Sequence, residues 1–213
     1  MNIFEDLGLS YQLVSTIKKL GYTIPTEIQG QSIPHIMAER DVIGESATGS
    51  GKTLAFGCGI VEHVVPERGL QALILTPTRE LAEQVKGSLK QLSDQKHLKI
   101  IAVYGGVAIS PQISDLRIAE VVVATPGRFL DHLQRGTINT SKIKLLVLDE
   151  VDRMFDMGFI NDVEKIIRAC PSKRQTLFFS ATVSSRVRSL ANNYMKMPTE
   201  VSAKKYVDPS KLK

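Results

Sequence analysis

The chain is poor in cysteine and histidine and contains no long apolar run. Its 213 residues include two cysteines, Cys58 and Cys170, and four histidines that form no pair with metal-ligand spacing. Two cysteines in apolar contexts make no disulfide framework, so we expect reduced thiols in the core of an intracellular protein. No stretch of about 18 apolar residues is present, and residues 1–6 lack the basic and apolar regions of a signal peptide. We therefore expect a protein of the cytoplasm, or of the nucleus in a eukaryotic cell, without a membrane partner.

The composition is ordinary for a globular protein, with 43% hydrophobic and 23% charged residues. The length predicts one large domain, residues 1–203, followed by a polar, basic segment, 204–213, which we interpret as a linker. The net charge of +5 is compatible with a polyanionic partner, but lysine and arginine are spread along the chain rather than clustered. Charge alone therefore selects no partner.

Short apolar runs of strand length alternate with amphipathic stretches. Because the runs are continuous rather than alternating, they indicate strands that are buried on both faces of a parallel sheet. The expected strands are 41–43, 73–75, 100–103, 121–124, 145–148 and 177–179. The expected helices are 10–20, 81–92, 126–135, 159–169 and 184–196, in addition to helical spacing after Thr53. The predicted fold class is α/β: a doubly wound, mostly parallel sheet with helices on both faces.

A polar cluster follows each of the six predicted strands. In doubly wound sheets ligands bind beyond the carboxyl ends of the strands, so these clusters predict one composite site along one edge. The clusters are Gly44–Thr53, Thr76–Leu81, Tyr104–Gly106, Thr125–Arg128, Asp149–Asp152 and Ser180–Thr182.

The first cluster, G-E-S-A-T-G-S-G-K-T, lies between a strand and a helix start and predicts a phosphate-binding loop. Gly49 and Gly51 allow a backbone that brings amide N–H groups close to phosphate oxygens. Lys52 is expected to reach the β and γ phosphates, and the Thr53 hydroxyl to help hold Mg²⁺. The strict pattern has glycine where this chain has Ser46. The alternative is a glycine turn that only caps a helix.

Three carboxylates follow the predicted strand 145–148. Asp149 is placed to hold Mg²⁺ directly or through water, and Glu150 to orient and deprotonate a water that attacks the γ-phosphate. Acidic residues also cap helices, which is the alternative interpretation.

Thr26 and Gln29 have the spacing of a helix capping box. In that interpretation the Gln29 side chain binds the first amide of its own helix. Alternatively the amide faces the hydrogen-bonding edge of a ligand. The residue pattern leaves both open.

Seven motifs occur in order: P-T-E-I-Q, A-T-G-S-G-K-T, P-T-R-E-L, G-G, T-P-G-R, L-D-E-V-D-R-M-F-D-M-G-F and S-A-T. In this order the sequence resembles the first RecA-like domain of the DEAD-box RNA helicases, from Phe4 to about Val201. It has D-E-V-D in place of D-E-A-D, and Ser46 where the family usually has alanine. The resemblance implies an ATP- and Mg²⁺-dependent enzyme that acts on single-stranded RNA or short duplexes. Residues 1–40 are then a helical extension that carries the adenine-reading motif.

The resemblance also implies residue roles at the nucleotide. Gln29 would read the adenine edge, with Tyr22 or Phe4 near the base. Asp152, Ser180 and Thr182 would couple hydrolysis to strand separation. The residues expected to bind the nucleotide are Phe4, Tyr22, Gln29, Thr48, Gly49, Ser50, Gly51, Lys52 and Thr53, with Lys52, Asp149 and Glu150 catalytic.

Three further motifs resemble the RNA-backbone segments of the family. Backbone amides, threonine hydroxyls and arginines suit phosphate contacts that do not read bases. The alternatives are tight turns and helix caps, above all for the paired glycines. The residues are Pro77, Thr78, Arg79, Gly105, Gly106, Thr125, Pro126, Gly127 and Arg128.

The family has a second RecA-like domain, which supplies arginines to the ATP site, and nothing after Thr182 could provide it. We therefore expect an N-terminal domain, monomeric, with weak ATPase activity and no unwinding alone. A DNA helicase, a nucleotide kinase and a non-catalytic RNA-binding module are the alternatives.

Overall fold

A seven-stranded parallel sheet, in the order β3-β4-β2-β5-β6-β1-β7, forms the centre of the protein. The structure is a computed structural model that describes residues 3–203, so the predicted linker at 204–213 lies outside the described residues. The strands are β1 (Val42–Ser46), β2 (Ala72–Leu75), β3 (Ile100–Val103), β4 (Val121–Ala124), β5 (Leu145–Asp149), β6 (Gln175–Ser180) and β7 (Thr199–Ala203).

The six predicted strands are confirmed, with two differences. The first strand continues through Ser46, so Gly44–Ser46 belong to β1 and not to the phosphate loop. A glycine is needed inside this strand because a Cβ on Gly44 would lie 2.5 Å from the Phe179 ring. The second difference is β7, which the sequence did not predict. It is a half-exposed edge strand with polar residues, so it lacks the apolar run that marked the others.

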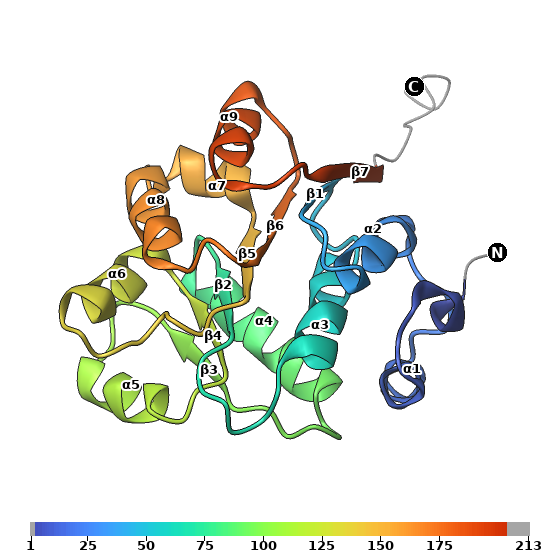
Figure 1. The fold of residues 1–213 in the computed structure, drawn as a ribbon, viewed down its shortest axis with the longest axis horizontal. Helices are drawn as coiled ribbons and strands as arrows, with labels where there is room; N and C mark the ends of the chain where they lie inside the picture. The colour runs from blue at the N-terminus through green and yellow to red at the C-terminus, as the bar shows by residue number, and fades with distance from the viewer. Residues whose placement is uncertain (1–2, 204–213) are drawn as a thin grey trace, which may run out of the picture.

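Helices cover both faces of the sheet (Figure 1). One face holds η1 (Phe4–Leu7), α1 (Tyr11–Lys19), α2 (Glu27–Met37), α3 (Lys52–His63) and α4 (Arg79–Leu92). The other holds α5 (Ile109–Leu116), α6 (Pro126–Gln134), α7 (Val151–Asp156), α8 (Ile160–Ala169) and α9 (Ser185–Tyr194). The doubly wound prediction is therefore confirmed, and α5 is an element that the sequence did not predict.

The two cores follow from the alternation of side chains along each strand. In β5, Leu145 and Val147 face the core under α1–α4, whereas Leu146 and Leu148 face the core under α5–α9. Both cores are apolar, which is why the strands read as continuous apolar runs. Cys58 and Cys170 are buried free thiols, as predicted, and burial raises the pKa of Cys170 to about 11.

The N-terminal helices are part of the first core. The Ser10 hydroxyl accepts a hydrogen bond from the Leu13 N–H (3.3 Å) and caps α1, as predicted, and Gly21 follows that helix in the left-handed conformation (φ 89°). Phe4 and Ile17 are fully buried against this side of the sheet. Within residues 3–203, no helix combines the length and apolarity that crossing a membrane requires.

Candidate functional site

The loop between β1 and α3 has the conformation that its glycines predict. Gly49 and Gly51 have φ values of 79° and 94°, in the left-handed region that favours glycine. Gly51 begins α3, so the loop ends at a helix N-terminus, where backbone N–H groups and the helix dipole favour an anion. A Cβ on Gly51 would lie 2.3 Å from Gln29 Nε2, so this position also requires glycine for space.

The loop holds its lysine close to its own backbone. Lys52 is buried, and its Nζ donates to the Ser46 carbonyl oxygen over 3.2 Å. Ser46, where the strict pattern has glycine, is accommodated because its hydroxyl accepts from the Ser50 hydroxyl (2.8 Å). Lys52 makes no ion pair among the described residues, so its charge is available to an anionic ligand.

Asp149 is a buried carboxylate at the end of β5. It is 3% exposed, and its Oδ1 accepts from the Glu150 N–H (3.0 Å). Burial raises the pKa of Asp149 to about 6, with Lys52 opposing that change and the Glu150 charge adding to it. Groups whose pKa is strongly shifted by burial and a neighbouring charge cluster at functional sites, so Asp149 is a candidate functional residue.

Glu150 has an uncommon backbone, with φ and ψ both 53°. A non-glycine residue in the left-handed region is mildly strained, and such residues cluster at functional sites. The Glu150 carboxylate is paired with Arg153, whose NH1 lies 3.1 Å from Oε2. The strained turn directs β5 into α7 and keeps the glutamate at the edge of the site.

A cavity of about 580 Å³ joins these residues. Its walls include Tyr22, Gln29, Thr48, Gly49, Gly51, Lys52, Thr53, Asp149 and Glu150, and side chains of α4 that the sequence analysis did not identify, such as Gln84 and Ser88. Of the two aromatic candidates, Tyr22 lines the cavity and is 47% exposed, whereas Phe4 is fully buried in the core. The geometry therefore favours Tyr22 over Phe4 as the residue beside a base.

Gln29 takes part in two interactions. Its Oε1 accepts from the Thr26 N–H (2.8 Å), which is the capping box, and its Nε2 donates to the Gly51 carbonyl oxygen (3.0 Å). The cap that the sequence left as an alternative is therefore present. A primary amide has a second N–H and a second oxygen lone pair, so hydrogen-bonding capacity toward a ligand remains on the cavity side.

Asp152 contacts both polar residues of the segment after β6. Its Oδ2 accepts from the Thr182 hydroxyl (3.0 Å) and the Thr182 N–H (3.1 Å), and its own N–H donates to the Ser180 hydroxyl (3.1 Å). The three residues that the resemblance groups together are therefore in direct contact. A displacement of the acidic segment after β5 would therefore pull on the segment after β6.

The three other polar segments meet beside the cavity, at the carboxyl ends of β2, β3 and β4. The Thr78 hydroxyl accepts from the Leu81 N–H (3.2 Å), so the helix cap that the sequence left as an alternative is present. Arg79 is exposed, with its guanidinium 5.0 Å from the centre of the Tyr104 ring. That arginine is held in place but is open to solvent, as a phosphate contact requires.

Gly105 and Gly106 are exposed with open space around them, and Gly106 has a φ of 80°, in the left-handed region that favours glycine. The Arg128 guanidinium already has partners within the protein: its Nη2 donates to the Val107 carbonyl oxygen (3.0 Å) and its Nη1 to Gln112 Oε1 (3.3 Å). Gln112 was not identified from the sequence, because no motif contains it. Thr125, Pro126 and Gly127 form the first turn of α6, with Pro126 buried at its start.

The fold and the site together define a P-loop protein of the α/β class, with a nucleotide-sized cavity at the carboxyl edge of the sheet and exposed polar segments beside it. A sequence model described as DEAD/DEAH box helicase matches residues 26–190. The chain therefore belongs to the DEAD/DEAH box helicase family.

Comparison with individual proteins agrees. The chain is 46% identical over 193 residues to the probable ATP-dependent RNA helicase of Methanocaldococcus jannaschii, covering 90% of this chain and 53% of that protein. It is 45% identical over 203 residues to the ATP-dependent RNA helicase CshA of Limosilactobacillus reuteri, covering 94% and 41%. A crystal structure of a DEAD box protein from the hyperthermophile Methanococcus jannaschii matches with a TM-score of 0.92 at 45% identity, covering 95% of this chain and 56% of that one. The chain thus spans about half the length of these relatives.

Proposed function

We propose that this chain is the first, ATP-binding RecA-like domain of an ATP-dependent RNA helicase in which D-E-V-D replaces D-E-A-D. The observation that supports this most directly is the cavity of about 580 Å³. It brings the phosphate loop, the strand-end acids Asp149 and Glu150, and the Gln29 amide to one space. The membership of the family, and relatives named ATP-dependent RNA helicases, support the same function.

The residues present fit ATP with Mg²⁺. The loop offers a cradle of left-handed glycines, Lys52 has no carboxylate partner among the described residues, and Asp149 is a buried acid that gains from a cation. Thr53 and Asp149 would hold Mg²⁺, which neutralises charge on the phosphates when bound. Tyr22 and Gln29 would face the base, and the amide matches the adjacent donor and acceptor of adenine.

Residues at the carboxyl edge of the sheet would carry out hydrolysis. Glu150 would accept the proton of the attacking water, and Lys52 would stabilise negative charge on the phosphates. Asp152 and Thr182 would transmit the state of the site to the segment after β6. Charge that develops on the transferred phosphoryl group also calls for arginines, and we assign these to a second RecA-like domain. The 213-residue chain is then a weak ATPase that separates no duplex alone.

RNA would bind along the polar segments after β2, β3 and β4. These present Arg79, exposed glycines and the start of α6, which suit sugar-phosphate contacts and read no base edges. Such contacts serve separation of short duplexes or remodelling of RNA–protein complexes in any sequence context.

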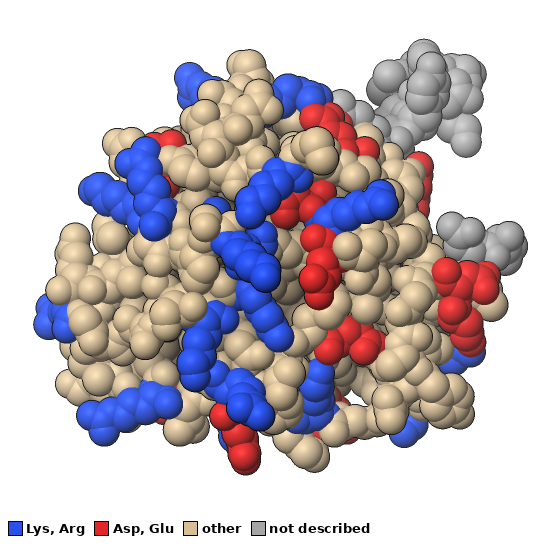
Figure 2. Space-filling view, viewed as in Figure 1, with Lys and Arg blue, Asp and Glu red and all other residues tan. Residues whose placement is uncertain are grey.

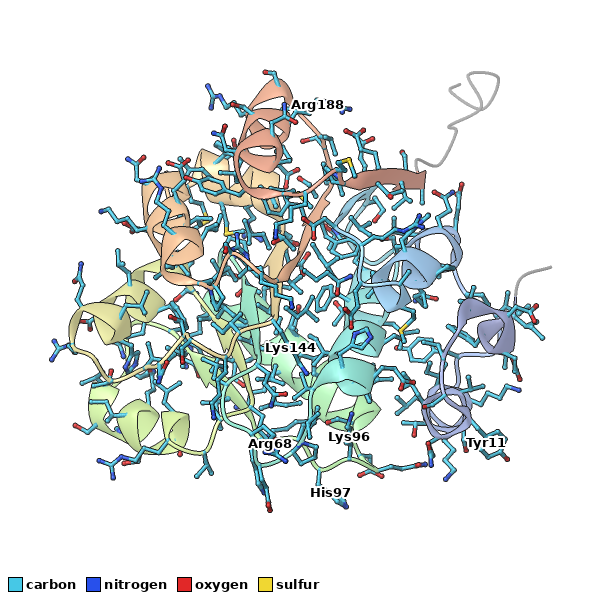
Figure 3. The ribbon with its side chains drawn as sticks, in the orientation of Figure 1. Tyr11, Arg68, Lys96, His97, Lys144 and Arg188 are labelled. Atoms are coloured by element: carbon cyan, nitrogen blue, oxygen red, sulfur yellow. The ribbon has the colours of Figure 1, made fainter. Side chains whose placement is uncertain are left out.

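Binding of a fluorescent ATP analogue to the 213-residue chain tests the nucleotide part of the proposal. Tyr22→Ala should weaken binding about tenfold, because stacking of a base on an aromatic ring contributes about 1–3 kcal/mol. Tyr11→Ala is the matched control, since Tyr11 is 88% exposed at the start of α1 (Figure 3) and does not line the cavity. Equal effects of the two changes would reject Tyr22 as the base contact.

Lys52→Ala should weaken binding of the triphosphate by at least about tenfold, which corresponds to loss of one charge-assisted contact of about 1.4 kcal/mol or more. Lys19→Ala, at an exposed position on α1, should have no effect. Unchanged affinity in Lys52→Ala would overturn the phosphate-loop assignment.

The rate of ATP hydrolysis with Mg²⁺ tests which nucleic acid activates the enzyme. The chain, alone and joined to a second RecA-like domain, would be assayed with single-stranded RNA, with DNA of the same sequence and with neither. We expect stimulation by RNA only in the two-domain protein. Equal stimulation by DNA would support the assignment as an ATPase and reject the assignment of RNA as its specific partner.

A further inference from the structure

The edge of the sheet at which the strands begin carries a band of lysine and arginine side chains. Figure 2 shows this band across the middle of the visible face, over the loops that lead into the strands. A cleft of about 380 Å³ lies in it, lined by Lys144, Lys173, Arg174 and Lys196, which we call the basic cleft. This edge is opposite the one that holds the nucleotide cavity.

The parallel sheet brings these residues together from distant parts of the sequence. Lys144 directly precedes β5, Arg174 directly precedes β6, and Lys196 lies three residues before β7. The buried Asp41, before β1, joins the start of β6 to the loop before β7: its Oδ1 accepts from the Thr176 N–H (2.8 Å) and its Oδ2 from the Lys196 N–H (2.7 Å). The loop that carries Lys196 is therefore held against the start of the sheet.

Two of the four cations already have partners. Arg174 donates to the Pro171 carbonyl oxygen (2.7 Å) and Lys196 to that of Ser172 (2.8 Å), as basic residues do near helix C-termini. Within residues 3–203, the side chains of Lys144 and Lys173 make no hydrogen bond or ion pair. These two lysines are exposed, so their charge faces solvent.

The positive charge of the cleft is not neutralised. Its single acidic wall residue, Glu39, lies 3.9 Å from His63 and is itself largely exposed. Lys144 also repels Lys96, whose pKa is lowered mainly by burial, with the charge of Glu62 acting in the opposite direction. An excess of positive charge at one surface raises the local concentration of polyanions.

The band continues beyond the cleft. Lys142 lies against Gly69, in the loop that carries Arg68, and Figure 3 shows Lys144, Lys96 and Arg68 on the same face. Arg68 lies in the loop before β2, so these cations lie at the starts of β2, β5, β6 and β7, and the sheet order places β1, with the acidic Glu39 and Asp41 before it, between β6 and β7. At about 4.8 Å between neighbouring strands, this is a row about 19 Å long, the reach of several nucleotides.

We propose that this basic edge is a second RNA-binding surface, which holds the sugar-phosphate backbone of RNA outside the carboxyl-edge site. Among residues 3–203, the cleft wall contains one apolar residue, Leu145, and no phenylalanine, tyrosine or tryptophan. Protein partners select aromatic and apolar anchors, whereas nucleic-acid interfaces are polar and positively charged. The choice of RNA as the polyanion rests on the proposed function. The basic edge itself is an additional surface, which ATP binding and hydrolysis do not require.

The test measures the affinity of the 213-residue chain for labelled single-stranded RNA of about 20 nucleotides between about 50 and 200 mM salt. The double variant Lys144→Gln, Lys173→Gln removes two charges and no hydrogen bond. Each lost phosphate contact lowers the slope of log affinity against log salt by about 0.7, so we expect a decrease of about 1.4. The control Lys19→Gln, Lys165→Gln removes the same charge from the covering helices α1 and α8 and should leave the slope unchanged.

Arg79→Gln separates this surface from the carboxyl edge. It should lower the slope by about 0.7 on its own, and its effect should add to that of the lysine pair if the two surfaces are independent. Photocrosslinking with thiouridine-containing RNA should label the peptide that carries Lys144 in the parent chain and not in the double variant.

Each outcome decides the inference. An equal decrease in the control variant, or an unchanged slope in the lysine variant with an intact melting temperature, overturns it while the proposed function stands. If Arg79→Gln has no effect but the lysine pair does, the basic edge is confirmed and the carboxyl-edge RNA site is rejected. Failure of the parent chain to bind RNA at low salt rejects both.

Discussion

Gln112 Oε1 lies 3.1 Å from Nε2 of His132, and both side chains are buried. The same oxygen accepts from Arg128, and the Gln112 amide nitrogen donates to the Tyr104 carbonyl oxygen over 3.0 Å. Gln112 therefore connects the loop that holds Gly105 and Gly106 to α6, the helix that follows Thr125. Gln112 belongs to neither of these two segments, which we propose to bind RNA, but its side chain fixes the distance between them.

Gln112→Leu should lower the free energy of unfolding by about 2 kcal/mol, because it leaves the Tyr104 carbonyl oxygen and Nε2 of His132 without their hydrogen-bond partner. We also expect weaker RNA binding with unchanged affinity for the ATP analogue. Chemical denaturation and the two binding assays measure these effects. Gln134→Leu, at an exposed position on α6, is the control, and an equal effect there would contradict the bridging role.

His132 predicts a pH dependence of stability. The imidazole is fully buried, and this burial is the main cause that lowers its pKa. The positive charges of Arg128 and, to a smaller extent, Arg135 also lower the pKa, whereas the negative charge of Asp131 raises it. A neutral ring protonated on Nε2 donates to Gln112 Oε1 (3.1 Å), and its Nδ1 lies 2.7 Å from the Thr137 hydroxyl, which is also within hydrogen-bond distance of the His132 carbonyl oxygen (3.1 Å). Below the usual histidine pKa the unfolded chain binds a proton that the folded chain does not, so the contribution of His132 to stability should fall as the pH decreases from 7 to about 5, opposite in sign to the contribution of Asp149.

Denaturation curves of the parent chain and of His132→Gln at a series of pH values isolate this contribution. The glutamine amide can still donate to Gln112 but cannot be protonated. We expect the stability difference between the two proteins to shift in favour of the variant as the pH falls. A difference independent of pH would show that His132 does not titrate in this range.

Gly51→Ala should destabilise the fold by at least about 1–2 kcal/mol, because alanine is strained in the left-handed conformation. Its Cβ would also displace Gln29, so binding of the ATP analogue should be lost with it. Gly87→Ala is the control, and we expect it to change stability in the opposite direction. Gly87 is exposed in α4 with nothing within 4 Å of an added Cβ, so alanine there should stabilise by about 0.5–1 kcal/mol.

Asp149→Asn should stabilise the protein at pH 7 while it weakens nucleotide binding. The pKa of Asp149 is raised from 3.8 to about 6, and one pH unit of pKa difference corresponds to about 1.4 kcal/mol. Ionisation of this buried group therefore costs the fold about 3 kcal/mol above pH 6, and the cost is absent below about pH 4. Thermal melts at pH 4 and pH 7 should show a gain for the variant only at pH 7.

Much of this protein could be predicted from local patterns. Local sequence patterns predict the six strands, the main helices, the Ser10 cap and the left-handed glycines of the phosphate loop, because each of these features depends on a few neighbouring residues. The polar clusters at strand ends were expected to share one edge because parallel strands place their carboxyl ends together. Strand β7 was missed because an exposed edge strand has no apolar run to mark it.

What the sequence determined by itself was the α/β class and the residues that make the phosphate loop, since periodicity and motif spacing are short-range properties. Only the tertiary structure decided that Gln29 contacts Gly51, that Tyr22 and not Phe4 lines the cavity, and that Gln112 joins two polar segments. It alone also gathered Lys144 and Lys173 into one cleft. These relationships join residues tens of positions apart, and their geometry comes from the order of strands in the sheet and the packing of helices on it.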